Sequence, residues 1–246
     1  MRNQIASEWR KLRTTRSAYG LLAGAVALAG LAAWAMVATM HFGSSVALTT
    51  LPGFAEMMVI VPIFVVVLGI RSYTDEARHG SIVPTLLADP NRLRVVAAKA
   101  AVLALAAVGF AVAASAMVAI VSTALLVAQG TAITVSLAAV VLLVGKAIVI
   151  CALWSTFGLG IGLTVSHQVA AIVGTMLWLL VGEGLVEMLA SGAAKFLPGH
   201  ASTALLGIAS ADSTLVAPLV GAALLAGWSL ASVGIGGKAL ARRDVV

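Results

Sequence analysis

The stretch RSYTDEARHGSIVPTLLADPNRLRVVAAK, from Arg71 to Lys99, decides the fold. It is the only long polar segment in the interior of an otherwise apolar chain, and it holds five of the 15 basic and three of the nine acidic residues. Apolar runs long enough to enter a bilayer lie on both sides of it. The stretch is therefore predicted to connect two membrane spans, and its details indicate more than a plain solvated connection.

The composition excludes a soluble protein. Of the 246 residues, 61% are hydrophobic and 10% are charged, whereas soluble domains carry about 25% charged residues. We therefore expect an all-α polytopic membrane protein, with residues 1–246 forming a single transmembrane domain. The net charge of +6 comes from basic residues at the ends of apolar runs, so it does not indicate nucleic-acid binding. The lone cysteine, Cys151, cannot form a disulfide within the chain.

Six apolar runs are predicted to span the membrane. Residues 71–94 would form the loop between the second and third spans, and residues 191–212 a short outer helical hairpin between the fifth and sixth. The spans are predicted at 18–40, 54–70, 95–128, 146–166, 169–189 and 214–236.

Lys146 complicates the run from 131 to 165, which is too long for one span and too short for two. A charge at mid-bilayer costs about 3 kcal/mol. We therefore expect residues 131–144 to pack at the outer boundary, Lys146 to lie near the outer surface, and the fourth span to begin there. A buried functional lysine is the alternative.

The N-terminal segment 1–17 is basic and amphipathic. Ile5, Trp9 and Leu12 recur at helical spacing, so they share one face. Such a helix lies in the membrane interface with tryptophan at head-group depth; a positive flank that merely orients the first span is the other interpretation. The residues assigned to this interfacial helix are Trp9, Arg10, Lys11 and Arg13.

The basic residues are distributed unevenly between the two predicted sides. The N-terminal segment, the central loop and the C-terminal tail hold 13 of the 15 lysines and arginines. Only Lys146 and Lys195 remain on the other side. Because cytoplasmic loops carry the excess of positive charge, both termini and the central loop are predicted to be cytoplasmic.

No catalytic or nucleotide-binding motif is present in the sequence. Glu183, Glu187 and His200 could be read as an outer metal site, but two glutamates and a histidine in a wet interface explain them better, and no metal site is assigned. The glycine run 158–162 lies within a predicted membrane helix, where close helix packing accounts for it. Residues 236–238 lack the remaining positions of a phosphate-binding loop. Any ATP must therefore be bound by another chain.

Four segments carry a family resemblance. They are SEWRKLRTTRS at 7–17, EARHGSIVPTLL at 76–87 with Pro90 and Lys99, the glycine run 158–162 with His167 and Gln168, and Glu183 with Leu197-Pro198-Gly199. Together they resemble the membrane subunits of ATP-binding-cassette (ABC) transporters of the type-2 exporter class.

The resemblance implies a permease without enzymatic activity in a bacterial plasma (inner) membrane. A second copy or a related permease would complete the pathway, and two separate ATPase subunits would bind ATP and Mg²⁺. The loop after the second span would hold a coupling helix that contacts the ATPase. Carried over to this chain, the contact residues would be Asp75, Glu76, Arg78, His79, Gly80, Thr85, Leu86 and Leu87.

The residues of the loop agree with a docking role. Thr74 is predicted to cap a short helix that ends at Gly80, since glycine tolerates the left-handed turn after a helix. Leu86 and Leu87 are apolar in a polar loop, which suits the groove of a partner. Burying both is worth roughly 3 to 6 kcal/mol. The alternative is that both leucines fold under the loop onto the membrane domain.

The cargo and two rival functions complete the predictions. Bulky apolar residues within the spans suggest a hydrophobic or amphipathic cargo, such as a drug, lipid or peptide. One rival is a carrier driven by an ion gradient, which needs ionisable groups near mid-bilayer, and Lys146 is its one candidate. The other is an intramembrane hydrolase, for which the sequence lacks a plausible base–nucleophile set although Ser115, Ser155 and Thr156 lie within spans. The possible cargo path consists of Trp34, Met36, Trp154, Phe157, Met176 and Trp178.

Overall fold

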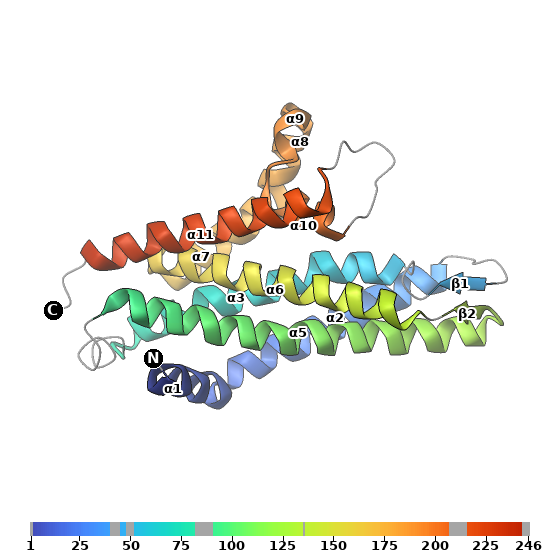
Figure 1. Cartoon of the computed structure of the whole chain (residues 1–246), viewed down its shortest axis with the longest axis horizontal. Coiled ribbons are helices and arrows are strands. Elements are labelled where there is room, and N and C mark those ends of the chain that lie inside the picture. Colours follow the sequence, from blue (N-terminus) through green and yellow to red (C-terminus); the bar gives the residue numbers. More distant parts are fainter. Residues whose placement is uncertain are drawn as a thin grey trace.

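The computed structural model describes residues 2–39, 45–47, 52–81, 91–134, 136–206 and 216–242, and these residues are almost entirely helical. Figure 1 shows the elements along the chain. They are α1 (Arg2–Thr14), α2 (Arg16–Thr39), β1 (Ser45–Ala47), α3 (Pro52–Arg78), α5 (Arg92–Ala128), β2 (Ala132–Thr134), α6 (Leu137–Val165), α7 (Gln168–Leu177), the π-helical η2 (Trp178–Gly182), α8 (Glu183–Leu189), α9 (Ser191–Ala194), α10 (Pro198–Leu206) and α11 (Pro218–Arg242).

Helix α6 is the centre of the bundle. It packs against α3, α11 and α5, while α2 packs on α3 and α5. Figure 1 shows α1 and the last turns of α11 at one end of the long axis, and the two strands at the other end. Five helical segments in the described residues are long and apolar enough to cross a membrane, so the chain is a multi-pass, helical membrane protein. These five are α2, α5, α6, the continuous run α7–η2–α8, and α11.

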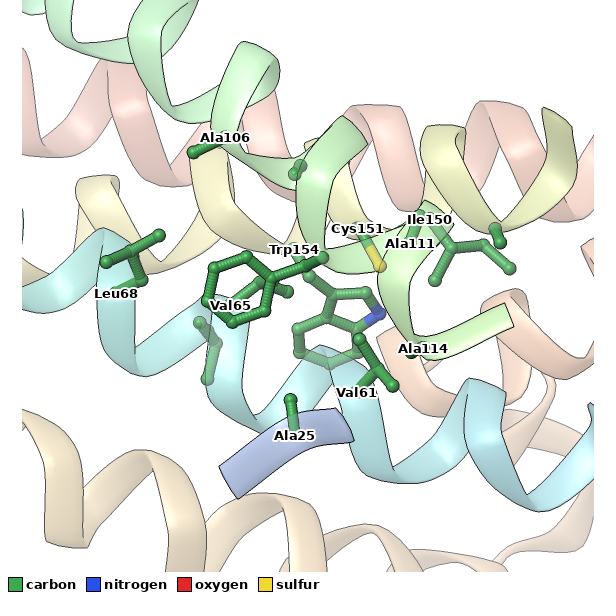
Figure 2. Close-up of a cluster of buried hydrophobic side chains, with 14 of the residues drawn as sticks. Ala25, Val61, Val65, Leu68, Ala106, Ala111, Ala114, Ile150, Cys151 and Trp154 are labelled. Atoms are coloured by element: carbon green, nitrogen blue, oxygen red, sulfur yellow. The ribbon is translucent and has the colours of Figure 1, made fainter. Parts of the chain in front are cut away.

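The core lies where α2, α3, α5 and α6 meet. Figure 2 shows the indole of Trp154 among Val61 and Val65 of α3 and Ala111 and Ala114 of α5. Small residues line these contacts because helices in a membrane associate through close packing instead of through expulsion of water. The alanines let the backbones approach, and the indole of Trp154 fills space between them together with the rings of Phe110 and Phe157.

Close packing of the glycine run is confirmed. A Cβ atom on Gly158 would overlap the carbonyl oxygen of Val66 on α3, and one on Gly160 would overlap the backbone of Ser232 on α11. Gly162 meets Ile70 of α3 in the same way. Glycines four residues apart therefore face α3, and the glycine between them faces α11. The run lets α6 contact two helices at backbone distance.

The predicted short helix Thr74–Gly80 is wrong as a separate element. Helix α3 continues without a break from Pro52 to Arg78. Thr74 is fully buried inside it and donates from Oγ1 to the carbonyl oxygen of Ile70 at 3.0 Å, so it does not cap a helix. The helix does end as expected, because Gly80 has a positive φ of 68° in the turn that follows.

The run from 131 to 165 also differs from the prediction. Leu137 to Val165 form one continuous helix, so the described residues from 137 onward are not a separate packing segment before a span that begins at Lys146. Lys146 lies 19 residues before Val165, which is about 28 Å along the axis and close to the thickness of the hydrocarbon layer. A helix longer than the bilayer accommodates both the lysine and the apolar residues before it.

Two short strands were not predicted. β1 and β2 pair in parallel, with Val46 opposite Ile133. Strands of three residues carry too little pattern to be recognised in an apolar sequence. They join the segment after α2 to the segment after α5 at the end of the bundle opposite α1.

The remaining boundaries refine the predictions. The run predicted as the fifth span contains a π-helical turn, and Figure 1 shows α8 and α9 projecting from the side of the bundle. Within 191–212 the structure describes α9 and α10, while residues 207–212 lie outside the described residues. Helix α11 continues to Arg242, beyond the predicted end of the sixth span, so its last turns carry the basic residues.

The glycine packing predicts a contrast between two single-methyl substitutions. Gly158→Ala should destabilise the protein by about 1–3 kcal/mol, because the backbone of α3 has to move away. Gly109→Ala in α5 is the matched control, since open space surrounds a Cβ atom there. Thermal unfolding in detergent, followed by tryptophan fluorescence, measures both; equal stability of the two variants would contradict the packing argument.

Candidate functional site

Four charged side chains from three helices meet at the end of the bundle that carries α1. They are Glu8 and Lys11 of α1, Glu76 of α3 and Lys99 of α5, and we call them the inner ion cluster. The ammonium of Lys99 lies 2.7 Å from Glu8 Oε2 and 2.8 Å from Glu76 Oε1. The ammonium of Lys11 lies 2.7 Å from Glu8 Oε1 and 2.9 Å from Glu76 Oε1.

Lys99 is the most enclosed member of the inner ion cluster. Its side chain is 2% exposed, and the ammonium also donates to the backbone carbonyl of Ser72 at 3.1 Å. The three acceptors, from Glu8, Glu76 and Ser72, satisfy all three N–H groups of the ammonium. Two carboxylates balance two ammonium groups, so burial leaves no net charge in the apolar surroundings.

The inner ion cluster lowers the pKa of Glu8 and raises the pKa of Lys11, the two cluster residues of α1. Burial by itself would raise the pKa of Glu8, but the ammonium groups of Lys99 and Lys11 outweigh it and hold that pKa below its ordinary value. Burial would lower the pKa of Lys11, but hydrogen bonds and charges from Glu8 and Glu76 raise it above its ordinary value. Both groups are therefore charged at neutral pH.

The predicted coupling residues that the structure describes lie at the end of α3 and in the turn after it. Asp75 accepts from the guanidinium of Arg71 at 3.0 Å, and Glu76 belongs to the inner ion cluster. Arg78, His79 and Gly80 form an exposed tip. The other predicted contact residues, Thr85, Leu86 and Leu87, lie outside the described residues.

The predicted interfacial segment forms a helix with one inward face. Trp9 and Leu12 are half-buried, and Leu12 packs against the core, while Arg10 and Arg13 are exposed. Lys11, one of the basic residues predicted at the membrane interface, contacts Glu8 and Glu76.

Sequence reasoning did not assign Glu8 or Lys99 a role in the site. Two signals could have found them: Glu8 is the only acidic residue in the basic N-terminal segment, and Lys99 is a lysine inside the predicted third span.

A cavity of about 570 Å³ adjoins the inner ion cluster. The inner ion cluster, the α1–α2 junction and further polar side chains of α3 line one part of it, and Leu68, Val102 and Leu103 line another. This volume is within the range of sites that hold small organic ligands.

The predicted cargo-path residues do not form one lining within a single chain. Trp154 and Phe157 are buried together, with ring centroids 5.5 Å apart in an edge-to-face arrangement. Trp34 and Trp178 are 52% and 43% exposed on α2 and at the start of η2. The two methionines of the set, Met36 and Met176, are half-buried.

A second polar cluster holds α10 at both of its ends. Glu183 accepts at 3.0 Å from the N–H of Gly199 in the first turn of α10, and Lys146 donates at 2.9 Å to the carbonyl of Leu206 in its last turn. The indole N–H of Trp154 donates to Ser202 Oγ at 2.8 Å between them. Acidic groups favour a helix N-terminus and basic groups its C-terminus, so both charges fit.

His200 lies between two carboxylates of α8. Its Nδ1 is 3.6 Å from Glu183 Oε2, and its Nε2 is 3.6 Å from Glu187 Oε2. The two ring nitrogens point to different carboxylates, so one metal ion cannot bind the three residues together. In the described part of the chain, no group of three or more metal-ligating side chains is placed to hold an ion.

Comparison with models of protein families and with characterised protein sequences found no match for this chain. The structure itself defines the class: a helical, multi-pass membrane protein with a buried ion cluster that joins α1, α3 and α5.

Removing the buried ammonium should unfold the site. Lys99→Met leaves Glu8 and Glu76 with only Lys11 as a cationic partner, and breaking a buried ion pair costs about 3–5 kcal/mol. The matched control is Lys238→Met at an exposed position of α11, which we expect to be close to neutral. Chemical unfolding in mixed micelles measures both; a Lys99→Met variant as stable as the control would refute a stabilising role for the cluster.

The docking of α1 should depend on pH with a defined sign. The pKa of Glu8 is lowered from 4.5, so its contribution to stability is present above pH 4.5 and is lost as pH falls through the lowered pKa. The raised pKa of Lys11 adds stability that is present below pH 10.5 and is lost above it.

Amide hydrogen exchange in α1 measures this dependence. Protection should decline at acid pH in the wild type and in the exposed control Glu187→Gln, whereas Glu8→Gln should be less protected at neutral pH and lose most of the acid decline. If the protection of α1 in Glu8→Gln still declined at acid pH as it does in the wild type, groups other than Glu8 would be responsible for the decline.

Proposed function

We propose that this chain is the membrane-spanning permease subunit of an ABC-type exporter. Two permease chains form the path, and two separate ATPase subunits bind ATP and Mg²⁺ and dock on the loop 71–94. The sequence resemblance supports this proposal, as does the lack of a nucleotide-binding motif in the chain. Residues 236–238 lie inside α11, where they cannot form a phosphate-binding loop.

The proposal includes six spans with both termini in the cytoplasm of a bacterial cell. Helix α3 is the sixth: its 27 residues extend about 40 Å, enough to cross the bilayer and continue beyond it. An even number of crossings agrees with α1 and the end of α11 lying at the same end of the bundle (Figure 1). The excess of lysine and arginine at that end favours the cytoplasmic side.

The observation that carries the proposal is the continuity of α3. Residues buried in the core and the exposed tip at Arg78 belong to one uninterrupted helix. A push on the tip therefore moves the part of α3 between Pro62 and Arg78 as one body, because Pro62 is the position in the helix that lacks a backbone N–H donor. Coupling of this kind requires two states with different contacts, and a stiff lever transmits the difference between them.

The inner ion cluster extends the lever to α1 and α5. Glu76 lies two residues before the exposed Arg78, and its carboxylate holds the ammonium groups of Lys11 and Lys99. Motion of the tip is thereby shared with the interfacial helix and with the inner end of α5. In this proposal the three helices move together when the ATPase subunits close.

The cargo is hydrophobic or amphipathic in this proposal. The exposed Trp34 and Trp178 then face a path formed between two permease chains, and Trp154 and Phe157 stiffen its wall from inside. A carrier driven by an ion gradient is the rival, and it needs a titratable group in the path. Lys146, its sequence candidate, donates to the α10 carbonyl of Leu206.

The docking loop provides the test of the function. Leu86→Asp combined with Leu87→Asp should weaken binding of the proposed ATPase subunit by over a hundredfold, which corresponds to about 3 kcal/mol. Arg78→Glu, at the exposed tip of α3 and outside the inner ion cluster, should leave the chain folded in the membrane but abolish cargo-stimulated ATP turnover. Val169→Asp, at an exposed position in the first turn of α7, is the control.

Co-purification and ATP turnover in reconstituted vesicles are the measurements. Full co-purification and full turnover of the double aspartate variant would refute the docking role of the loop. Cargo movement that needs no ATP and stops when an ion gradient is collapsed would replace the proposal with the carrier.

A further inference from the structure

The cavity beside the inner ion cluster is graded from polar to apolar. At one end it is lined by Arg71, Asp75 and Glu76 of α3, and one turn away by Leu68 of the same helix. On α5 the lining passes from Lys99 to Val102 and Leu103. Because α3 and α5 run in opposite directions, the apolar residues of both lie on the side toward the core of the bundle.

This gradient matches the orientation of an amphipathic molecule in a bilayer. The polar end lies where α1 meets α2, at the interfacial level, and the apolar end lies deeper between the spans. A head group would occupy the polar end and an alkyl chain would follow Leu68 and Leu103. A molecule bound in this way could enter sideways from the inner leaflet or directly from water.

The charges of the lining select the head group. Three cations and three carboxylates line the cavity, so a ligand with a large net charge gains nothing over water. Among the cations, Lys11 and Arg71 are 40% and 30% exposed, and both can donate to a phosphate. The six lining residues are Lys11, Arg71 and Lys99, with Glu8, Asp75 and Glu76.

One carboxylate oxygen of the lining lacks a donor. Oε2 of Glu76 is buried and has no hydrogen-bond partner among the described residues, although Oε1 of the same group holds two lysines. An unpartnered buried acceptor is costly. A primary ammonium would supply an N–H donor to it, whereas a quaternary ammonium has none.

We propose that this cavity binds an amphipathic molecule whose zwitterionic head carries a phosphate and a primary ammonium. The phosphate lies against Arg71 and Lys11, the ammonium against Glu76 and Asp75, and the alkyl chain against Leu68 and Leu103. Phosphatidylethanolamine of the inner leaflet and a free lyso-lipid share this chemistry. The proposal does not depend on the proposed transport function, and neither test decides the other.

The test uses the full chain in nanodiscs that contain equal amounts of phosphatidylethanolamine and phosphatidylcholine. Native mass spectrometry after mild extraction measures which lipid is retained. We expect the wild type to retain phosphatidylethanolamine in about tenfold preference. Thr15→Trp should block the mouth of the cavity and remove the preference, and Arg71→Gln should reduce it.

Thr39→Trp is the matched control for the blocking variant. Thr15 and Thr39 are both exposed, and each donates at 2.7 Å to the carbonyl four residues earlier, but Thr39 does not line the cavity. Thermal unfolding shows whether Thr15→Trp remains folded; if it does not, Arg71→Gln decides. Equal retention of both lipids by the wild type, or an unchanged preference in the folded Thr15→Trp variant, would overturn the proposal.

A second arm identifies the source of the molecule. Lysophosphatidylethanolamine is added below its micellar concentration to the chain in phosphatidylcholine nanodiscs. Saturable binding that Thr15→Trp abolishes supports the site and shows that it fills from water. Retention of phosphatidylethanolamine without binding of the lyso-lipid supports the site and shows that it fills from the bilayer.

Discussion

The ammonium of Lys99 depends on two carboxylates from other helices, because hardly any water reaches it. In an apolar environment each buried charge requires a partner from within the protein. Glu8 of α1 and Glu76 of α3 are those partners, so loss of α1 would leave Lys99 with Glu76 as its one carboxylate partner within the cluster. Forming such pairs contributes little net stability, whereas breaking one is expensive. The inner ion cluster therefore specifies one arrangement of three helices more than it strengthens the fold.

The same constraint orders the other polar cluster. Helix α10 is short, and its terminal N–H and C=O groups have no partners within the helix. Glu183 and Lys146 satisfy one group at each end, with charges that oppose the helix dipole. Charged side chains are costly in a membrane segment, but here Lys146 and Glu183 fix the position of the nine-residue helix α10. Both clusters place each charge opposite a partner from another helix.

The helical membrane class could be predicted because apolar length and charge are properties of local sequence. The glycine packing of α6 was also predictable, since a membrane helix has few other uses for three alternating glycines. The continuity of α3 was missed because Thr74 looks like a helix cap, and only burial shows that its hydroxyl turns back to Ile70. Glu8 and Lys99 are 91 residues apart, so no local pattern could pair them. The two strands were not predicted for the same reason, because each forms only by pairing with a strand that is distant in the sequence.

The parallel pairing of β1 with β2 limits how the helices can move relative to one another. It ties the segment between α2 and α3 to the segment between α5 and α6. Axial slippage of one pair of helices past the other would shift the ladder by about 3.3 Å per residue and break its backbone pairing. At that end of the bundle the ladder therefore links α2, α3, α5 and α6 to one another. In the described part of the chain, strand pairing does not join these four helices to the segment α7–α11. The two groups of helices can therefore separate at that end without breaking backbone pairing between strands.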